Sequence, residues 1–430
     1  MSDVGLRYCG GSIVRQESTR LAALYLMVVE QLLPIYRDKT GQLFAGDLWH
    51  KDLLMHLEYL DHFMLASPCH QQDPPRDAKP LFVDGSQLEI IELPPQRSLL
   101  RSLKAMPTII YRLCKAIRRA DIVHSAIVGW PIPMGWIVTP LTLVFRKPLV
   151  IIVESAPWRL PHGIATGWKR RLRAAIQEVL GKWVLRNADL VICTQNEYRQ
   201  SLLGPKQARG FVIPASWIDE KDILSQDEAD EVWEKKLSTS GSRLQILFVG
   251  RLSPEKGLHV LLQAMRQLNT TSLPISLDIL GEGSLKNECD LAASELKGLT
   301  EVNVLGTVPY GAPLFSVIRR YDAVVVPSIT DEQPRIVYDA YSQAVPVLAS
   351  DTPGLRSCVN GGETGLFALP NDVSALSGLL KYAVEHRSEL RQLGLQSLIY
   401  AHSMTHQEMH RQRATLLHAM MDRRKQGRLS

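Results

Sequence analysis

Short apolar runs alternate with amphipathic stretches along most of the chain, at the lengths expected of strands and helices. In the second half, runs rich in β-branched residues predict strands at 244–249, 275–280, 302–305, 322–326 and 345–349. In the first half, similar runs predict strands at 32–36, 62–67, 81–83, 88–93, 120–124, 149–153, 187–194 and 210–214. Because strands that alternate with helices form mostly parallel sheets, the pattern predicts an α/β protein with doubly wound sheets.

The alternation stops between the two halves, where the chain becomes charged and ends in Ser-Thr-Ser-Gly-Ser at 238–242. Such a stretch is typical of a connection between domains. We therefore expect a first domain at 1–215, an interdomain passage at 216–243, a second domain at 244–400, and a terminal basic helix and tail at 401–430.

Two longer apolar stretches raise the question of a membrane segment. The stretch 21–33 contains Glu30 and lacks a small-residue cleavage site, so it predicts a buried helix rather than a signal peptide. The stretch 126–145 is uncharged and long enough to span a bilayer, but glycines and prolines interrupt it. We expect a buried or membrane-grazing loop and helix there.

Two helical segments of the first half are strongly basic. Residues 97–119 carry seven basic side chains and no acidic one, among regularly spaced apolar residues, and Pro107 is expected to split the segment into two helices. A second basic helix opens at 169–173. These are either surface helices with solvated charges or a basic amphipathic face that attracts anionic lipid headgroups.

Composition limits the remaining options. The 430 residues are 45% hydrophobic and 22% charged, which is ordinary for a folded enzyme of two domains. The net charge of +5 is too small to argue for a nucleic-acid partner. The six cysteines are scattered and predict reduced, mostly buried thiols in a cytoplasmic protein. The twelve histidines likewise show no ligand spacing, so no metal site is predicted.

The predicted strand at 244–249 leads into Gly-Arg-Leu-Ser-Pro-Glu-Lys-Gly at 250–257 and then into an apolar helical opening. A strand, a short loop and a helix in this order aim backbone N–H groups and the cations Arg251 and Lys256 at one anion. The alternative is that both are solvated loop cations. Farther on, Asp331 and Asp339 stand eight positions apart, and carboxylates accept hydrogen bonds from sugar hydroxyls. Together these features suggest an enzyme that binds a nucleotide-sugar.

The second half resembles the retaining glycosyltransferases of GT-B fold, glycosyl transferases group 1, a large bacterial group that builds polysaccharides and glycolipids. The matching residues lie at 248–257, 280–283, 304–306, 325–328, 340–347, 354 and 362–366. The resemblance covers roughly 244–372 and implies two Rossmann-like domains facing a central cleft. It places the nucleotide on the C-terminal domain and the acceptor on the N-terminal one.

The resemblance also implies roles on the donor side. Arg251 and Lys256, next to Gly250, would hold the diphosphate, and contacts near Gly281 and Glu282 would select the base and sugar. Asp331 and Asp339 stand where the family has a pair of glutamates.

Asp331 would then contact the donor sugar and Asp339 the ribose. Glu332 could supply the first carboxylate instead of Asp331. The neighbouring loop residues, whose backbone amides would approach the sugar and phosphate, are Gln333, Pro334 and Arg335.

On the first domain, the family often carries two alternating histidines after a strand. Here His124 is the first of them and Ala126 stands at the second position. His124 is expected either to bind a sugar as a catalytic-site residue or to be a buried structural histidine. Acceptor-binding candidates are Asp47 and Trp49 in the loop 41–49, and Glu154 in the segment 154–159.

The predicted function is retaining transfer of a sugar from a nucleotide-diphosphate donor to a saccharide or lipid-linked acceptor, in exopolysaccharide or glycolipid synthesis. No cofactor or divalent metal is expected, since the two cations compensate the phosphate charge. The expected location is cytoplasmic, at the inner face of an anionic membrane in peripheral contact. The alternatives are a catalytically inactive GT-B module that binds glycans or partners, and a nucleotide-sugar epimerase.

Overall fold

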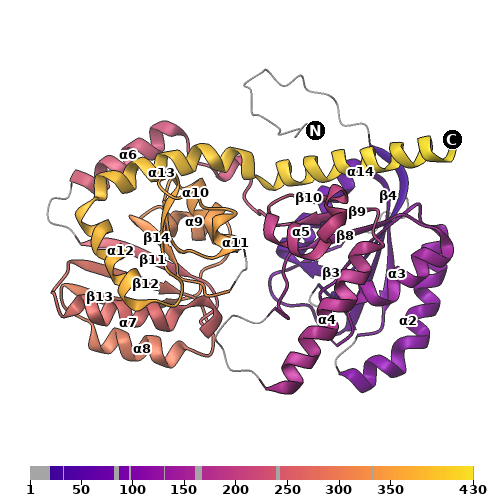
Figure 1. The fold of residues 1–430 in the computed structure, drawn as a ribbon, viewed down its shortest axis with the longest axis horizontal. Coiled ribbons are helices and arrows are strands. Elements are labelled where there is room, and N and C mark those ends of the chain that lie inside the picture. Colours follow the sequence, from indigo (N-terminus) through magenta and orange to yellow (C-terminus); the bar gives the residue numbers. More distant parts are fainter. Residues whose placement is uncertain are drawn as a thin grey trace.

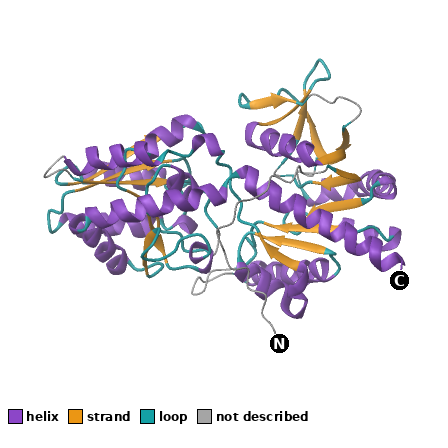
Figure 2. Cartoon of the chain, turned by 90° about the horizontal axis from the view of Figure 1, so that it is seen from above, coloured by secondary structure: helices purple, strands orange, loops and turns teal. Residues whose placement is uncertain are grey.

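The computed structural model describes residues 20–31, 33–81, 87–95, 98–129, 131–159, 167–238, 243–330 and 333–429. Figure 1 shows two lobes side by side, with the C-terminal helix running from the second lobe onto the first. Each lobe is a sheet flanked by helices, as the view from above also shows (Figure 2). The sheets are mostly parallel and doubly wound, so the predicted fold class is confirmed.

The first lobe is built on a sheet whose central strands are all parallel. Its strands are β1 (Leu21–Val28), β2 (Ile35–Arg37), β3 (Leu43–Gly46), β4 (Leu60–Gln71), β5 (Ala78–Pro80), β6 (Leu88–Leu93), β7 (Ile122–Ala126), β8 (Leu149–Val153), β9 (Leu190–Cys193) and β10 (Gly210–Val212). They lie in the order β10-β9-β8-β7-β1-β4-β2-β3-β5, with β6 paired to β4. The helices are α1 (Asp47–Tyr59), α2 (Leu99–Arg119), α3 (Met134–Phe145), α4 (Trp168–Arg186) and α5 (Asn196–Leu203).

The second lobe has a fully parallel sheet in the order β13-β12-β11-β14-β15-β16. Its strands are β11 (Leu244–Val249), β12 (Ile275–Leu280), β13 (Thr300–Gly306), β14 (Ala323–Val326), β15 (Val347–Ser350) and β16 (Gly365–Ala368). The remaining helices of the chain are α6 (Gln226–Ser238), α7 (Leu258–Asn269), α8 (Lys286–Glu295), α9 (Ala312–Ile318), α10 (Ile336–Ser342), α11 (Pro353–Arg356), α12 (Val373–Glu385), α13 (Arg387–Ala401) and α14 (His406–Leu429).

Strand β11 shows why this sheet needs helices on both faces. Ile246 and Phe248 point into one hydrophobic cluster, and Leu247 between them points into another. A strand buried on both sides is apolar at successive positions, as the central strands of parallel sheets are. The predicted strands at 244–249 and 275–280 match β11 and β12 residue for residue.

The helix predicted for 21–33 is wrong, because β1 occupies Leu21–Val28. This strand lies at the centre of its sheet, between β4 and β7, and its last four residues are all buried. Burial on both faces removes the polar–apolar alternation that marks a strand, so a short central strand and a buried helix share one sequence pattern. The short length of the apolar run was the feature that favoured a strand over a helix.

The predicted break at Pro107 is also wrong, because α2 continues through it as one helix of 21 residues. A proline in a helix leaves the carbonyl four residues earlier without its usual partner. Here Pro107 and Leu103 are both exposed, so water can satisfy that carbonyl. The helix therefore tolerates the proline on its solvent side.

The segments expected to connect and to end the domains take part in the cores. Ala229 and Trp233 of α6 belong to the cluster that contains β11, and the Trp233 indole N–H donates to the Ala344 carbonyl at 2.8 Å. At the other end, Met409 and Leu417 of α14 pack in the core of the first lobe. Thus much of the predicted passage is part of the second lobe, and the predicted tail is a docked helix.

Within the stretch 126–145, the expected helix is α3 (Met134–Phe145). None of the described helices is long and apolar enough to cross a bilayer. Five cysteines lie in the described part of the chain and are free thiols, four of them buried.

Candidate donor site

The strand order of the second sheet reverses between β11 and β14, which are neighbours although two strands separate them in sequence. In open parallel sheets, ligands bind beyond the carboxyl ends of the strands at such a switch point. Arg251 and Lys256 follow β11, and the loop with Gln333 and Arg335 follows β14. The predicted donor-binding segments therefore meet at the edge where a ligand is expected.

The loops after β11 and β14 are held together by backbone contacts. Gly257 has a φ of 69°, and a Cβ placed on it would lie 1.7 Å from the Pro327 carbonyl oxygen. The Ile329 N–H donates to the Glu255 carbonyl at 3.1 Å. Only glycine fits at 257, and this close approach fixes the start of α7 against the second loop.

The loop after β12 lies at the same edge of the sheet and contacts the loop after β11. A Cβ on Gly281 would lie 1.8 Å from the Gly250 carbonyl oxygen. The Leu252 N–H donates to the Glu282 carbonyl at 2.9 Å, while the Glu282 side chain is exposed. Gly250, Gly281 and Glu282, three of the residues predicted to bind the donor, thus lie together through backbone contacts.

Both predicted cations lie on this edge. The Arg251 side chain is 75% exposed, and its guanidinium is 3.9 Å from the Glu255 carboxylate. Lys256 is half-buried at the end of the short 3-10 turn Pro254–Lys256, directly before Gly257 and the first turn of α7. The arrangement brings two positive side chains and a helix N-terminus to one place, which suits a diphosphate.

The predicted carboxylates are only partly described. Asp331 and Glu332 lie outside the described residues. Asp339 is buried on α10, where it accepts a hydrogen bond from the Tyr310 hydroxyl at 2.9 Å. Burial raises the pKa of the Asp339 carboxyl to about 7.

Gln333 and Arg335 reach from the second lobe to the first. The Gln333 amide nitrogen donates to the Thr194 carbonyl at 3.1 Å, and its amide oxygen accepts from the Ala215 N–H at 3.3 Å. The Arg335 guanidinium lies 3.3 Å from the Glu154 carboxylate. Sequence reasoning had not singled out Thr194 or Ala215 as site residues, because only the tertiary structure sets them opposite Gln333.

Pro334 lies between these two residues and starts the turn that leads into α10. Its carbonyl accepts from the Val337 N–H at 3.3 Å. The Arg335 guanidinium also lies 5.0 Å from the centre of the Trp217 ring, in cation–π geometry. The loop after β14 is therefore anchored on both lobes.

The remaining first-lobe candidates have different surroundings. Glu154 follows β8 and faces Arg335. Asp47 is exposed at the start of α1, 4.0 Å from Lys79. Trp49 is a core residue with 8% of its surface exposed, so the structure places it inside the lobe rather than on an acceptor-binding surface.

His124 lies on β7 with its ring 5.9 Å from that of Tyr25. It is buried, and burial lowers its pKa to about 3, so the imidazole is neutral at physiological pH. The burial fits the expectation of a structural histidine, and sugar binding by His124 stays a prediction.

In the sequence, Glu30 is a polar interruption of an apolar stretch. The first sheet reverses between β1 and β7, and Glu30 follows β1 at that point. Its carboxyl accepts from the Met134 N–H, the first residue of α3, at 2.7 Å, and burial raises its pKa well above the usual value. A carboxyl directly after a central strand was the feature of the sequence that could have marked Glu30 as a candidate site residue.

Comparison with known proteins agrees with this geometry. A family model described as Glycosyl transferases group 1 matches residues 229–396, and one described as Glycosyl transferase 4-like domain matches 59–215. The chain is 24% identical over 270 residues to a glycogen synthase of Mycobacterium tuberculosis, covering 62% of this chain and 61% of that protein. It is 27% identical over 297 residues to a D-inositol 3-phosphate glycosyltransferase of Nocardia farcinica, covering 65% of this chain and 62% of that protein. The matches thus span about three fifths of these relatives.

Solved structures show the same fold. Anabaena HepE in complex with UDP superposes with a TM-score of 0.65 at 16% identity, over 92% of this chain and all of that one. Sucrose-phosphate synthase from Thermosynechococcus elongatus superposes with a TM-score of 0.66 at 16% identity, over 93% of this chain and 99% of that one. Matching models in both lobes, the shared fold and the switch-point loops together show that the chain belongs to the glycosyl transferases group 1 family.

Proposed function

We propose that the protein is a retaining glycosyltransferase that moves a sugar from a nucleotide-diphosphate donor to a saccharide or lipid-linked acceptor. One observation carries the proposal. The cations Arg251 and Lys256 lie at the switch point of the second sheet, beside a loop that contacts Glu154 of the first lobe. This arrangement supports a donor site on one lobe that faces an acceptor site on the other.

In this proposal, Arg251 and Lys256 hold the diphosphate and stabilise the charge that grows on it as the sugar leaves. Preorganised cations of this kind contribute much of the rate enhancement in group transfer. Asp339 accepts hydrogen bonds from the nucleotide, and Asp331 or Glu332 contacts the sugar. Contacts between the lobes at Gln333 and Arg335 exclude water and so protect the donor from hydrolysis.

The exposed surface of α4 supports a lipid-linked acceptor. Its large exposed apolar residues recur every three or four positions, so they form one stripe along the helix. They are Trp168, Leu172, Ile176, Val179 and Trp183. Four basic residues, all exposed, occupy the first turns between them, at 169, 170, 171 and 173.

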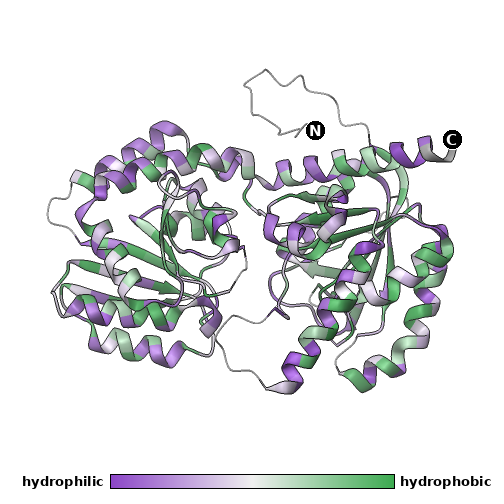
Figure 3. Cartoon of the chain, in the orientation of Figure 1, coloured by the Kyte–Doolittle hydropathy of each residue, from purple (hydrophilic) through white to green (hydrophobic). Residues whose placement is uncertain are grey.

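Helix α2 adds to this surface. Leu100 and Tyr111 are 75% and 71% exposed on it, and both helices pack against α3, which lies between them. Figure 3 shows the mixture of apolar and hydrophilic residues on α2 and α4. An apolar stripe flanked by cations is the signature of a helix that lies on an anionic membrane. The acceptor would then be met at the cytoplasmic face of that membrane.

The test is a donor screen. Purified protein is incubated with nucleotide-diphosphate sugars of different bases, with membrane extract as acceptor, and the wild type is compared with Lys256→Ala. The expected result is acceptor-dependent release of a nucleoside diphosphate, lost in the variant. A matched control is Arg266→Ala, which removes a partly exposed cation of α7 that pairs with Glu295.

Two results would overturn the proposal. Tight nucleotide binding in calorimetry without turnover on any acceptor would indicate an inactive binding module. Conversion of the donor sugar without any dependence on acceptor would indicate an epimerase.

A further inference from the structure

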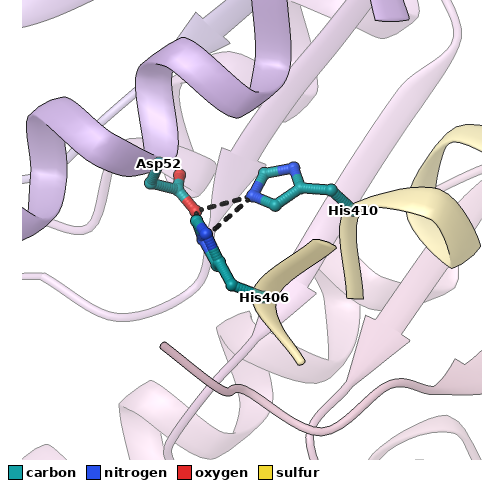
Figure 4. Close-up of side chains that lie close together, drawn as sticks. All are labelled: Asp52, His406 and His410. Carbon is teal, nitrogen blue, oxygen red and sulfur yellow. Dashed lines mark hydrogen bonds and ion pairs between the residues drawn. The ribbon is translucent and has the colours of Figure 1, made fainter. Parts of the chain in front are cut away.

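Three side chains that are far apart in the sequence converge between the first and the last helix of the described chain. Asp52 lies on α1, and His406 and His410 lie in the first turns of α14, four residues apart and therefore on one face. All three are buried. Figure 4 shows the two imidazole rings and the carboxylate pointing toward one common position.

The distances between the three converging atoms are nearly equal. Asp52 Oδ1 is 3.3 Å from His406 Nε2 and 3.1 Å from His410 Nε2, and the two nitrogens are 3.2 Å apart. A zinc ion bonds nitrogen and carboxylate oxygen at about 2.0–2.2 Å, so two ligands of a tetrahedral site are about 3.3–3.5 Å apart. The three atoms thus form one face of such a tetrahedron, with a fourth position left over.

Hydrogen bonds can also close this triangle, because both Nε2–H groups can donate to the two lone pairs of Asp52 Oδ1. That arrangement leaves two N–H donors side by side, with their nitrogens 3.2 Å apart. A cation at the centre replaces this donor–donor contact with three metal–ligand bonds, because all three lone pairs then point inward.

The surroundings also fit. The second ring nitrogen of His410 lies 3.3 Å from the Tyr59 hydroxyl, and a metal-bound histidine commonly donates its other N–H to such an acceptor. The buried Arg413 forms an ion pair with Asp52 at 3.9 Å from Oδ1, so it balances the carboxylate charge but lies too far away to occupy the lone pairs of that oxygen.

We propose that Asp52, His406 and His410 bind one divalent transition-metal ion of the zinc class as a structural site. Borderline ligands of this kind select zinc and similar ions over magnesium or calcium. The ion would fasten α14 to α1 after the chain has returned from the second lobe. The proposal departs from the expectation from sequence that the histidines form no metal site.

Such a site would also steady the region where the chain crosses between lobes. The backbone N–H of His406 donates to the Ile218 carbonyl at 2.8 Å. The His406 ring stacks on that of Trp217, with 5.1 Å between the ring centres. Trp217 in turn lies under Arg335 of the loop after β14. The metal would therefore fix the base on which that loop rests.

The test measures metal directly in the full chain, purified without a histidine tag. Elemental analysis after dialysis against a weak chelator is expected to give about one zinc per chain in the wild type, and much less in His410→Ala and Asp52→Asn. The matched control is His402→Ala, which removes an exposed histidine from the preceding turn and is expected to keep the metal. Zinc is also expected to raise the Tm of the wild type but not of His410→Ala.

If a variant fails to fold, measurements on the wild type still decide the question. Cobalt(II) added to wild-type protein stripped of metal is expected to give the intense visible absorption of tetrahedral coordination, which added zinc then abolishes. Absence of stoichiometric zinc together with absence of that absorption would overturn the proposal. So would equal metal content in the wild type and in folded Asp52→Asn.

Discussion

The guanidinium of Arg335 and the carboxylate of Glu154 form an ion pair at 3.3 Å that joins the loop after β14 in the second lobe to the end of β8 in the first. Arg335 was predicted from sequence to be donor-binding and Glu154 acceptor-binding. Their contact brings the two predicted half-sites to one place. Gln333, two residues before Arg335, contacts Thr194 and Ala215 at the same junction.

Breaking this pair is expected to loosen the contact between the lobes with little loss of stability. Both side chains are about half exposed, and exposed ion pairs contribute about 0.2–1 kcal/mol. Glu154→Gln should therefore leave the Tm nearly unchanged but increase the radius of gyration in solution X-ray scattering. Asp230→Asn, which breaks a pair with Arg391 in the second lobe, is the control and should leave the scattering unchanged. Identical scattering of both variants and the wild type would contradict the role of the pair.

Lys256→Ala is expected to lower kcat by about 10²–10³-fold, the usual cost of losing one group that stabilises transition-state charge. Arg251→Ala should act in the same direction. The measurement is steady-state kinetics with the donor found in the screen. Arg266→Ala should keep wild-type kinetics, and a comparable loss in that control would show that general charge, rather than the loop, is responsible.

Gly257→Ala is expected to disrupt the donor site because its Cβ would lie 1.7 Å from the Pro327 carbonyl oxygen. We expect nucleotide binding to be lost and the free energy of unfolding to fall by about 1–3 kcal/mol. Calorimetry and denaturant unfolding measure the two effects. Gly378→Ala on α12 is the control, since its Cβ would meet nothing within 4 Å and alanine favours helix. Unaltered nucleotide affinity in Gly257→Ala would refute the close packing of the loops.

Asp339 makes stability depend on pH in a direction unusual for a carboxyl. Its folded-state pKa is raised by burial from 3.8 to about 7, so between these values the folded chain keeps a proton that the unfolded chain releases. The free energy of unfolding should therefore fall as pH rises from about 4 to about 7, by on the order of a few kcal/mol, and the Asp339 contribution should level off above 7. Asp339→Asn should flatten this slope in urea titrations at several pH values. An equal slope in the variant would show that another group causes it.

The stripe on α4 predicts binding to anionic vesicles. Replacing Trp168, Leu172 and Val179 together with serine should reduce cosedimentation with phosphatidylglycerol vesicles at any salt concentration. Replacing Arg101, Lys104, Arg112 and Lys115 with glutamine should abolish binding at low salt, because the basic face provides the electrostatic attraction. Leu291→Ser, which removes an exposed leucine from the second lobe, is the control. Unchanged binding of both multiple variants would refute the membrane surface.

Much of the second lobe was determined by local sequence. The strands β11 and β12 are short, β-branched and bounded by loops, so their ends could be predicted to the residue. Arg251 and Lys256 follow such a strand, and their place at the sheet edge follows from strand, loop and helix alone. The first lobe was harder, because central strands such as β1 lack alternation and resemble buried helices.

Tertiary structure decided what depends on residues that are distant in sequence. Asp52 and His410 are separated by 358 positions, so no spacing along the chain could reveal their contact. The pairing of Glu154 with Arg335 likewise follows from how the two lobes meet, and the burial of Trp49 from packing inside the first lobe. Sequence determines local backbone preference and the chemistry available at each strand end. Which side chains share a site is settled only when long-range packing brings separate elements together.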